Sequence, residues 1–98
     1  MITCIAGKND IAVKGTRFIL EEKLVSKDNL LVCFNLTDKG VDTFQPSFKR
    51  FANNNGLKEC SIKDLFDIKD LILISLEYDR LIPINKFKCK KIYNTHFS

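Results

Sequence analysis

The sequence predicts an α/β fold in which an open parallel β-sheet carries helices on both faces. The first reason is that short, nearly wholly apolar runs alternate with segments whose apolar residues recur at helical spacing. The second is that the most apolar run, Leu71 to Ser75, has the composition of a strand covered on both sides. Strands and helices that alternate over such short distances form right-handed βαβ units. A chain of 98 residues can build one such domain with a modest core.

The first predicted strand, Ile2 to Ala6, is an apolar run with β-branched members that stops at Gly7. A helix follows it, with Asn9 or Asp10 capping the first amide groups. One face of this helix is marked by residues at helical spacing: Ile11, Ala12, Gly15, Phe18 and Ile19. The glycine on that inner face lets the helix lie close to the sheet.

A second apolar run, Leu30 to Phe34, predicts the next strand, and the polar stretch from Asn35 to Asp42 predicts a long loop. A second helix is indicated after this loop, with Pro46 in its first turn and a stop at Asn55-Gly56. The inner face of that helix is marked by Phe44, Phe48, Phe51 and Ala52.

The second half of the chain contains shorter elements. A third strand is predicted from Glu59 to Ile62, and Ser61 with Asp64 resembles a capping box that opens a turn from Lys63 to Phe66. The apolar run that starts at Leu71 is the fourth and strongest strand.

A short helical turn begins at Pro83, and a last strand runs from Lys91 to His96. Together these elements predict a Rossmann-like arrangement. We find no internal repeat, low-complexity segment or domain linker, so we expect residues 1–98 to form one structural unit.

The composition is that of an ordinary soluble globular protein, with 45% hydrophobic and 29% charged residues. No apolar run approaches the roughly 18 residues that span a bilayer, so we expect no membrane partner. The opening residues are too short a run, and lack the basic flank, for a signal peptide. We therefore expect a cytoplasmic location.

Cysteine spacing and charge exclude further classes of function. The four cysteines fall singly, with no C-x-x-C pair, so we expect reduced thiols and no metal site. The formal net charge of +4 comes largely from dispersed lysines, with a local cluster at Lys86, Lys88, Lys90 and Lys91. Such a run is usually a solvated face, which argues against nucleic acid as a partner. A weakly basic surface also suits a small anionic substrate.

Polar side chains follow the predicted strands at the edge where an open parallel sheet binds its ligands. They lie in residues 7–10, 35–42 and 77–80 and at Asn94 and His96. The turn from Gly7 to Asp10 offers free helix amides to an anion. Taken alone, Asn9 or Asp10 is about as well explained as a plain helix cap as it is as a ligand-binding residue. The turn lacks the glycines of G-x-G-x-x-G and is not a P-loop, which argues against nicotinamide and ATP.

Asn94 and His96 are two residues apart on a predicted strand, so their side chains emerge on the same face. A lone histidine is more often a hydrogen-bonded structural residue than a functional one. Position at the carboxyl edge shifts that balance toward a functional role for the pair.

The chain closes with Y-N-T-H-F-S, residues 93–98, which resembles the start of the N-x-H-x-S-L-L-P motif of the folate-dependent formyltransferase family. The motif follows an apolar strand and the loop E-Y-D-R-L-I-P, residues 77–83, in the order that the family requires. The segments I-A-G-K-N-D-I-A, residues 5–12, and D-T-F-Q-P-S, residues 42–47, look most like the enzymes that formylate nucleotide-linked amino sugars. The resemblance covers essentially the whole chain but only the first part of the family's catalytic domain.

The resemblance implies transfer of a formyl group from N10-formyltetrahydrofolate to the primary amine of a nucleotide-linked, dTDP-type amino sugar. Asn94 would supply amide donors to the oxyanion, and His96 would also donate to it and take part in proton transfer. The resemblance places one loop against the folate: Tyr78, Asp79, Arg80, Leu81 and Ile82. It places a second set near the nucleotide-linked sugar: Lys8, Asn9, Asp10, Gln45 and Ser47.

The family's third catalytic residue is an aspartate well beyond the histidine, and it has no counterpart in these 98 residues. We therefore expect residues 1–98 to be the amino-terminal portion of a truncated catalytic domain, inactive alone. The alternatives are a piece of a methionyl-tRNA formyltransferase, or a non-catalytic module that binds a nucleotide or a partner protein. A second copy of the chain, in a homodimer, is a further candidate partner.

Overall fold

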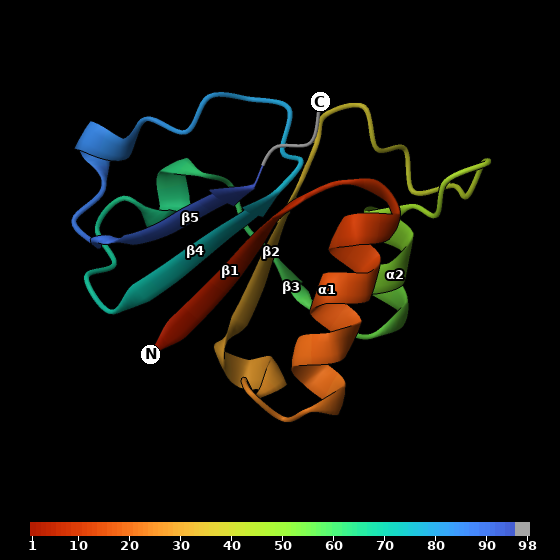
Figure 1. Cartoon of the computed structure of the whole chain (residues 1–98), viewed down its shortest axis with the longest axis horizontal. Helices are drawn as coiled ribbons and strands as arrows, with labels where there is room; N and C mark the ends of the chain where they lie inside the picture. The colour runs from red at the N-terminus through yellow and green to blue at the C-terminus, as the bar shows by residue number, and fades with distance from the viewer. Residues whose placement is uncertain (96–98) are drawn as a thin grey trace.

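A computed structural model describes residues 1–95, and it contains one parallel sheet of five strands in the order β3-β2-β1-β4-β5 (Figure 1). The strands are β1 (Ile2–Gly7), β2 (Leu30–Phe34), β3 (Lys58–Glu59), β4 (Leu71–Leu76) and β5 (Lys91–Thr95). Every neighbouring pair is parallel. The predicted α/β fold with a parallel sheet is confirmed.

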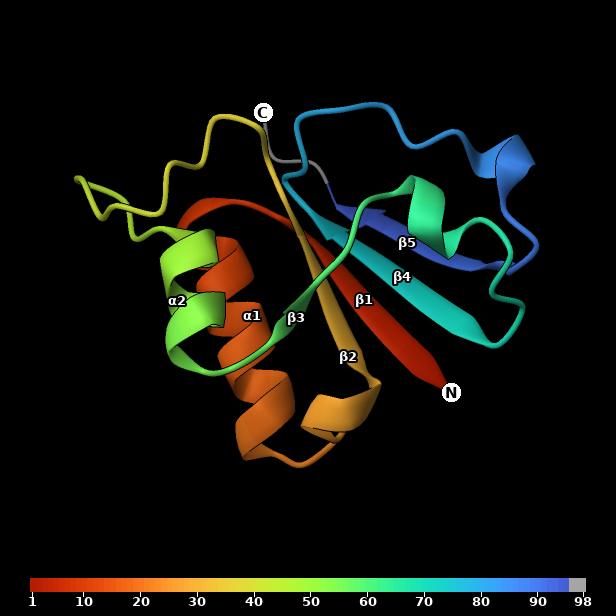
Figure 2. The ribbon, with the colours of Figure 1, turned by 180° about the vertical axis from the view of Figure 1, so that it is seen from behind.

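Both α-helices of the described chain cover the same face of the sheet. α1 (Asn9–Glu21) follows β1, α2 (Phe48–Asn54) follows β2, and they lie side by side (Figures 1 and 2). Their core combines sheet and helix residues, including Ile5, Val32 and Phe48. Two βα units that step in the same direction across a sheet place their helices on one side, because both crossovers are right-handed.

The other face of the sheet is covered by 3₁₀ turns and irregular chain instead of α-helices. η2 (Lys63–Leu65) lies over β4 and β5 in Figure 2, and η3 (Ile84–Lys86) precedes the buried Phe87. A third turn, η1 (Lys27–Asn29), leads into β2. We expected helices on both faces of the sheet. The structure has α-helices on one face and single 3₁₀ turns on the other, because the connections from β3 to β4 and from β4 to β5 are shorter than those that contain α1 and α2.

The buried face of α1 differs from the predicted one. It consists of Ala12, Val13 and Thr16, while Phe18 is 57% exposed. Gly15 does lie against the sheet, since a Cβ there would come within 2.8 Å of Leu76 Cδ1. Ala12 and Ile19 of the predicted face also pack into the core, so the prediction is wrong mainly for the aromatic ring of Phe18.

α2 begins later than predicted, and Phe44 does not belong to its inner face. Phe44 is 95% exposed and Pro46 precedes the N-cap residue, Ser47, whose hydroxyl accepts from Arg50 N at 3.0 Å. The predicted stop is correct, with Asn55 as the C-cap and Gly56 at φ 66°. A positive φ is a conformation that glycine adopts readily.

The start of α2 is fixed by a carboxylate from the preceding loop. Asp38 Oδ2 accepts from Lys49 N at 2.9 Å, and Asp38 Oδ1 accepts from the Ser47 hydroxyl and from Gly40 N. Burial opposes ionisation of Asp38, but these hydrogen bonds outweigh it and lower its pKa. The helix therefore begins where this carboxylate holds it, and residues 43–46 stay outside.

The capping box is confirmed, because Ser61 N donates to Asp64 Oδ2 at 2.9 Å and Asp64 N donates to Ser61 Oγ at 3.4 Å. The third strand is Lys58–Glu59 rather than 59–62, since this box turns the chain away from the sheet. β5 matches its prediction up to Thr95, and His96 lies outside the described residues. Within the described chain, no helix has the length and apolar character needed to cross a membrane.

Candidate functional site

The carboxyl ends of the central strands meet at one edge of the sheet. Gly7 pairs in register with Leu76, and Leu76 pairs with Thr95, so β1, β4 and β5 end at the same level. Three hollows open along this edge, and between them they include every predicted site residue that the structure describes.

The first hollow brings Asn94 together with the predicted folate loop. It has a volume of about 380 Å³ and is lined by Asn94 and seven other residues: Tyr78, Asp79, Arg80, Leu81, Ile82, Ile84 and Ile92. Asn94 is exposed on β5, paired in register with Ser75. His96, the predicted partner of Asn94, lies outside the described residues.

The lining of this hollow, which we call the loop cavity, is mainly aliphatic. Leu81 is 98% exposed and Ile84 is 62% exposed, so two large apolar side chains of this lining are open to solvent. Within residues 1–95, the amide groups of Arg80 and Leu81 make no hydrogen bond. The cavity therefore offers apolar walls and backbone donors to a flat, hydrogen-bonding molecule.

The base of this loop is anchored to β2. Tyr78 is largely buried, and its hydroxyl oxygen lies 3.6 Å from Cys33 Sγ. Burial, with a contribution from this contact, raises the pKa of Tyr78 well above its ordinary range. The phenol is therefore a neutral core group.

Asn35 is a residue of this edge that the sequence analysis did not single out. It directly follows β2, is 3% exposed, and its Oδ1 accepts from Asp79 N at 3.2 Å. In the sequence it is only the first polar residue after an apolar strand. That position is a usable signal, because such residues sit at the ligand edge of a parallel sheet.

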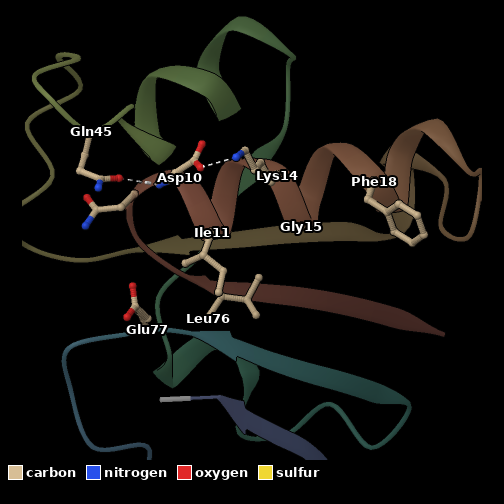
Figure 3. A pocket seen from close by; sticks show the side chains of 9 residues that line it. Asp10, Ile11, Lys14, Gly15, Phe18, Gln45, Leu76 and Glu77 are labelled. Carbon is tan, nitrogen blue, oxygen red and sulfur yellow. Dashed lines mark hydrogen bonds and ion pairs between the residues drawn. The ribbon is translucent and has the colours of Figure 1, made fainter. Parts of the chain in front are cut away.

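The second hollow lies along the start of α1, has a volume of about 610 Å³, and is shown in Figure 3. It brings together three of the predicted substrate residues, Asn9, Asp10 and Gln45. Lys14 and Glu77, which the sequence analysis did not propose as ligands, also line it. Glu77 adopts a φ of 58°, a conformation that is uncommon for a residue with a side chain.

The cap of α1 comes from Gln45 rather than from Asn9 or Asp10. Gln45 Oε1 accepts from Asp10 N at 3.3 Å, and the Asp10 carboxylate instead pairs with Lys14 Nζ at 2.8 Å (Figure 3). Asn9 has a φ of 60° and makes no side-chain cap. A distant side chain thus replaces the local cap that the sequence indicates.

The third hollow, about 170 Å³, is lined by Lys8, Asn9, Gln45 and Ser47 among others. Asn9 and Gln45 line both this hollow and the one in Figure 3, so the two are adjacent. Ser47 is buried, donates to Asp38 and accepts from Arg50 N, so both functions of its hydroxyl are already used in the helix start. Lys8 is half-buried, and its amide donates to Leu76 O at 3.3 Å.

The sequence predicts that Asn94 and the turn from Gly7 to Asp10 lie at the same edge of the sheet, which would allow them to share one cleft. Within the described residues, Asn94 lines the loop cavity, whereas Asn9 and Asp10 line the hollows beside α1. The chain at Glu77 and Tyr78 lies between them, since Glu77 faces one hollow and Tyr78 the other. The edge thus provides two neighbouring sites on either side of one loop.

The cysteines are all free thiols in this structure. Cys4 Sγ and Cys60 Sγ lie 3.8 Å apart, and this contact raises the pKa of Cys4 and lowers that of Cys60. Within residues 1–95, no group of three or more potential ligands is arranged to hold a metal ion.

Two solved structures are similar to this chain over nearly its whole length. WlaRD, described as a sugar 3N-formyl transferase in the presence of dTDP and 5-N-formyl-THF, is 39% identical with a TM-score of 0.93 over 99% of this chain. The N-formyltransferase from Helicobacter canadensis, in complex with folinic acid and dTDP-3-aminofucose, is 40% identical with a TM-score of 0.90 over 96% of this chain.

No protein-family model and no curated protein sequence matches the chain. This chain spans 35% of the length of each of the two enzymes. In sequence and fold the chain is similar to the corresponding third of these sugar N-formyltransferases.

Proposed function

We propose that this chain is part of an enzyme that transfers a formyl group from N10-formyltetrahydrofolate to the primary amine of a dTDP-linked amino sugar. The observation that carries the proposal is the pair of related enzymes at 39% and 40% identity, one with dTDP and 5-N-formyl-THF and one with folinic acid and dTDP-3-aminofucose. Two adjacent hollows at the carboxyl edge match a reaction that joins two molecules.

The loop cavity fits the folate. Its aliphatic walls, Leu81, Ile82 and Ile84, suit the faces of a bicyclic pterin ring. The backbone amides of Arg80 and Leu81, without partners in residues 1–95, suit the hydrogen-bonding edge of such a ring. When bound there, the folate would supply the formyl carbon.

Asn94 faces the same cavity from β5 and is exposed, so its side-chain amide can donate to an oxygen that becomes negative during transfer. His96 follows two residues later, and its imidazole would hold or transfer a proton near neutral pH. The amine has to be neutral to attack, so a proton acceptor next to it favours the reaction.

The hollows beside α1 are assigned to the nucleotide-linked sugar. Lys8 and Lys14 bring positive charge, and Asn9 and Gln45 bring amides that both donate and accept hydrogen bonds. A diphosphate and a sugar need this combination of groups. Ser47 contributes only through α2, because its hydroxyl is already bonded on both sides.

Titration calorimetry of the 98-residue chain with 5-formyltetrahydrofolate and, separately, with dTDP tests this assignment. We expect Leu81→Ser to weaken folate binding about tenfold and to leave dTDP binding unchanged, because a nearly fully exposed leucine of the cavity wall is lost. Leu24→Ser is the matched control, since Leu24 is also exposed but lines none of the three hollows. Equal effects of both variants on folate binding would contradict the assignment.

A further inference from the structure

Asn35 links two parts of the carboxyl edge that are not neighbours in the sheet. It stands at the end of β2, whereas Asp79 follows β4, and β1 lies between these strands. The hydrogen bond from Asp79 N to Asn35 Oδ1, 3.2 Å long, therefore passes across the end of the central strand. Few other side chains can make this connection, because it requires a short acceptor at the level where the strands end.

The same side chain has a feature that fold stability does not explain. Asn35 Nδ2 is buried and has no hydrogen-bond partner within the described residues. A buried N–H group without a partner costs free energy, and such a group calls for a specific reason. An apolar residue of similar size would avoid this cost, so the fold alone does not favour an asparagine here.

A second contact acts between the same two segments. Cys33, two residues before Asn35 and on the same face of β2, lies against the Tyr78 hydroxyl at 3.6 Å. Tyr78 and Asp79 are thus both tied to the end of β2. The next residues, Arg80 and Leu81, are exposed and make no backbone hydrogen bond within residues 1–95.

We propose that Asn35 is the positioning residue of the folate loop, holding its base at Asp79 so that the free amides of Arg80 and Leu81 face the loop cavity. This inference rests on the proposed function only for the identity of the ligand, a folate. The hydrogen bond between Asn35 and Asp79 does not depend on that identity. Asn35 acts through Asp79 and has no contact with the reacting atoms. Placing the acceptor oxygen of Asn35 at this point also buries its Nδ2 without a partner in residues 1–95, which costs free energy.

Hydrogen exchange of individual amides, measured by NMR on the 98-residue chain, tests the link. In the unmodified chain we expect the Asp79 amide to exchange about tenfold or more slowly than those of Arg80 and Leu81, because within residues 1–95 only the first of these three amides donates to the protein. Comparable rates for the three amides would overturn the proposal without any variant being made.

Three variants separate positioning from a structural role. Asn35→Ala should speed exchange at Asp79 and weaken 5-formyltetrahydrofolate binding several-fold, while dTDP binding and the urea midpoint change little. Asn35→Asp keeps an acceptor oxygen and should restore most of the Asp79 protection. Ser75→Ala is the control, since Ser75 Oγ is equally buried and without a partner but does not contact the loop.

The outcomes distinguish this inference from the proposed function. Asp79 protection that is lost in Asn35→Ala and restored in Asn35→Asp, in a chain that binds no folate, would support the link and count against the folate assignment. Unchanged Asp79 exchange in Asn35→Ala, or a loss of protection as large in Ser75→Ala or Asn35→Asp, would overturn the link. Folate binding that Asn35→Ala leaves intact would show that the loop needs no positioning by Asn35.

Discussion

Gly7 lies where β1 passes closest to β4, and it has no room for a side chain. A Cβ at this position would lie 2.5 Å from Leu76 O, the carbonyl that accepts from Lys8 N. We expect Gly7→Ala to lower the free energy of unfolding by about 1–3 kcal/mol, because backbone on both sides has to move. Urea denaturation measures this as a shift of the midpoint at constant slope.

Gly15 provides the matched comparison. Its added Cβ would meet Leu76 Cδ1 at 2.8 Å, the end of a flexible side chain that can turn away. Alanine is also a better helix former than glycine, by about 1 kcal/mol. Gly15→Ala should therefore change the free energy of unfolding by less than about 1 kcal/mol. If Gly15→Ala were as destabilising as Gly7→Ala, the Leu76 side chain would not be able to turn away from the added methyl group.

At the scale of residues, sequence reasoning found the side chains that line the edge but not the ones that arrange it. Asp10 and the loop from residue 78 could be placed at this edge because they come shortly after apolar strands, and Asn94 because it lies near the end of the last predicted strand. The hydrogen bonds made by Asn35 and Gln45 could not be predicted, since their partners, Asp79 and Asp10, lie 44 and 35 residues away in the sequence. No periodic pattern encodes a single hydrogen bond between distant loops.

Among the elements, α2 depends on one carboxylate. Asp38 caps its start, and the hydrogen bonds that it accepts lower its pKa below the ordinary 3.8 despite partial burial. A lowered pKa means that the ionised group stabilises the fold above its ordinary pKa, and that this stabilisation is lost as the pH falls through the folded-state pKa. Stability should therefore decline below about pH 4.

The variant Asp38→Ala isolates this contribution. At pH 7 we expect it to lower the free energy of unfolding by about 1–2 kcal/mol, as for the loss of a helix cap. The difference from the unmodified chain should shrink as the pH falls through the lowered folded-state pKa of Asp38, because the carboxylate is then protonated in both states. Asp67→Ala is the control, since Asp67 makes only an exposed ion pair with Lys88. A difference that does not shrink at any pH at which the unmodified chain stays folded, down to the most acidic, would mean that the charge of Asp38 is not what holds α2.

The strands were more predictable than the helices. β2 matches its prediction at both ends, and β1 and β4 extend theirs by one residue, because a fully buried strand is a continuous apolar run with no other interpretation. The faces of α1 and the start of α2 differ, because Phe18 and Phe44 fit the spacing of a buried face but are exposed. Packing against Gly15 and capping by Asp38 decided these positions, and both depend on tertiary contacts.

At the scale of the whole molecule, the alternation of strands and helices in the sequence predicted the parallel sheet. It did not predict that the carboxyl edge of the sheet carries separate hollows on either side of the chain at Glu77 and Tyr78. The register of β1, β4 and β5 brings their ends level, while the conformation of Glu77 and the anchoring of Tyr78 turn the chain between the hollows. A loop that separates two cavities has no sequence signature of its own. The two-site geometry is nevertheless what a reaction between a folate and a nucleotide-linked sugar requires.

If the proposed function is right, residues 1–98 should have no enzymatic activity on their own. The chain spans 35% of each related enzyme. Holding two reactants in attack geometry contributes on the order of 7–11 kcal/mol to catalysis, and catalytic groups that act as a unit lose most of their effect when one is missing. We therefore expect no measurable formyl transfer by residues 1–98, assayed as tetrahydrofolate formed from N10-formyltetrahydrofolate with a panel of nucleotide-linked amino sugars.

A chimera that joins residues 1–98 to the remaining part of WlaRD tests whether this chain supplies a working part of the site. At 39% identity and a TM-score of 0.93, the chain should pack in place of its counterpart, and the chimera should transfer formyl to a dTDP-linked amino sugar. His96→Asn in the chimera should lower kcat by about 100-fold or more, because general acid–base catalysis contributes factors of that size. Lys90→Asn, a change at an exposed lysine that lines none of the three hollows, should leave kcat unchanged. Robust turnover by residues 1–98 alone would contradict the need for the rest of the cleft, and a folded chimera that binds both ligands but is inactive on every amine would favour a binding module over an enzyme.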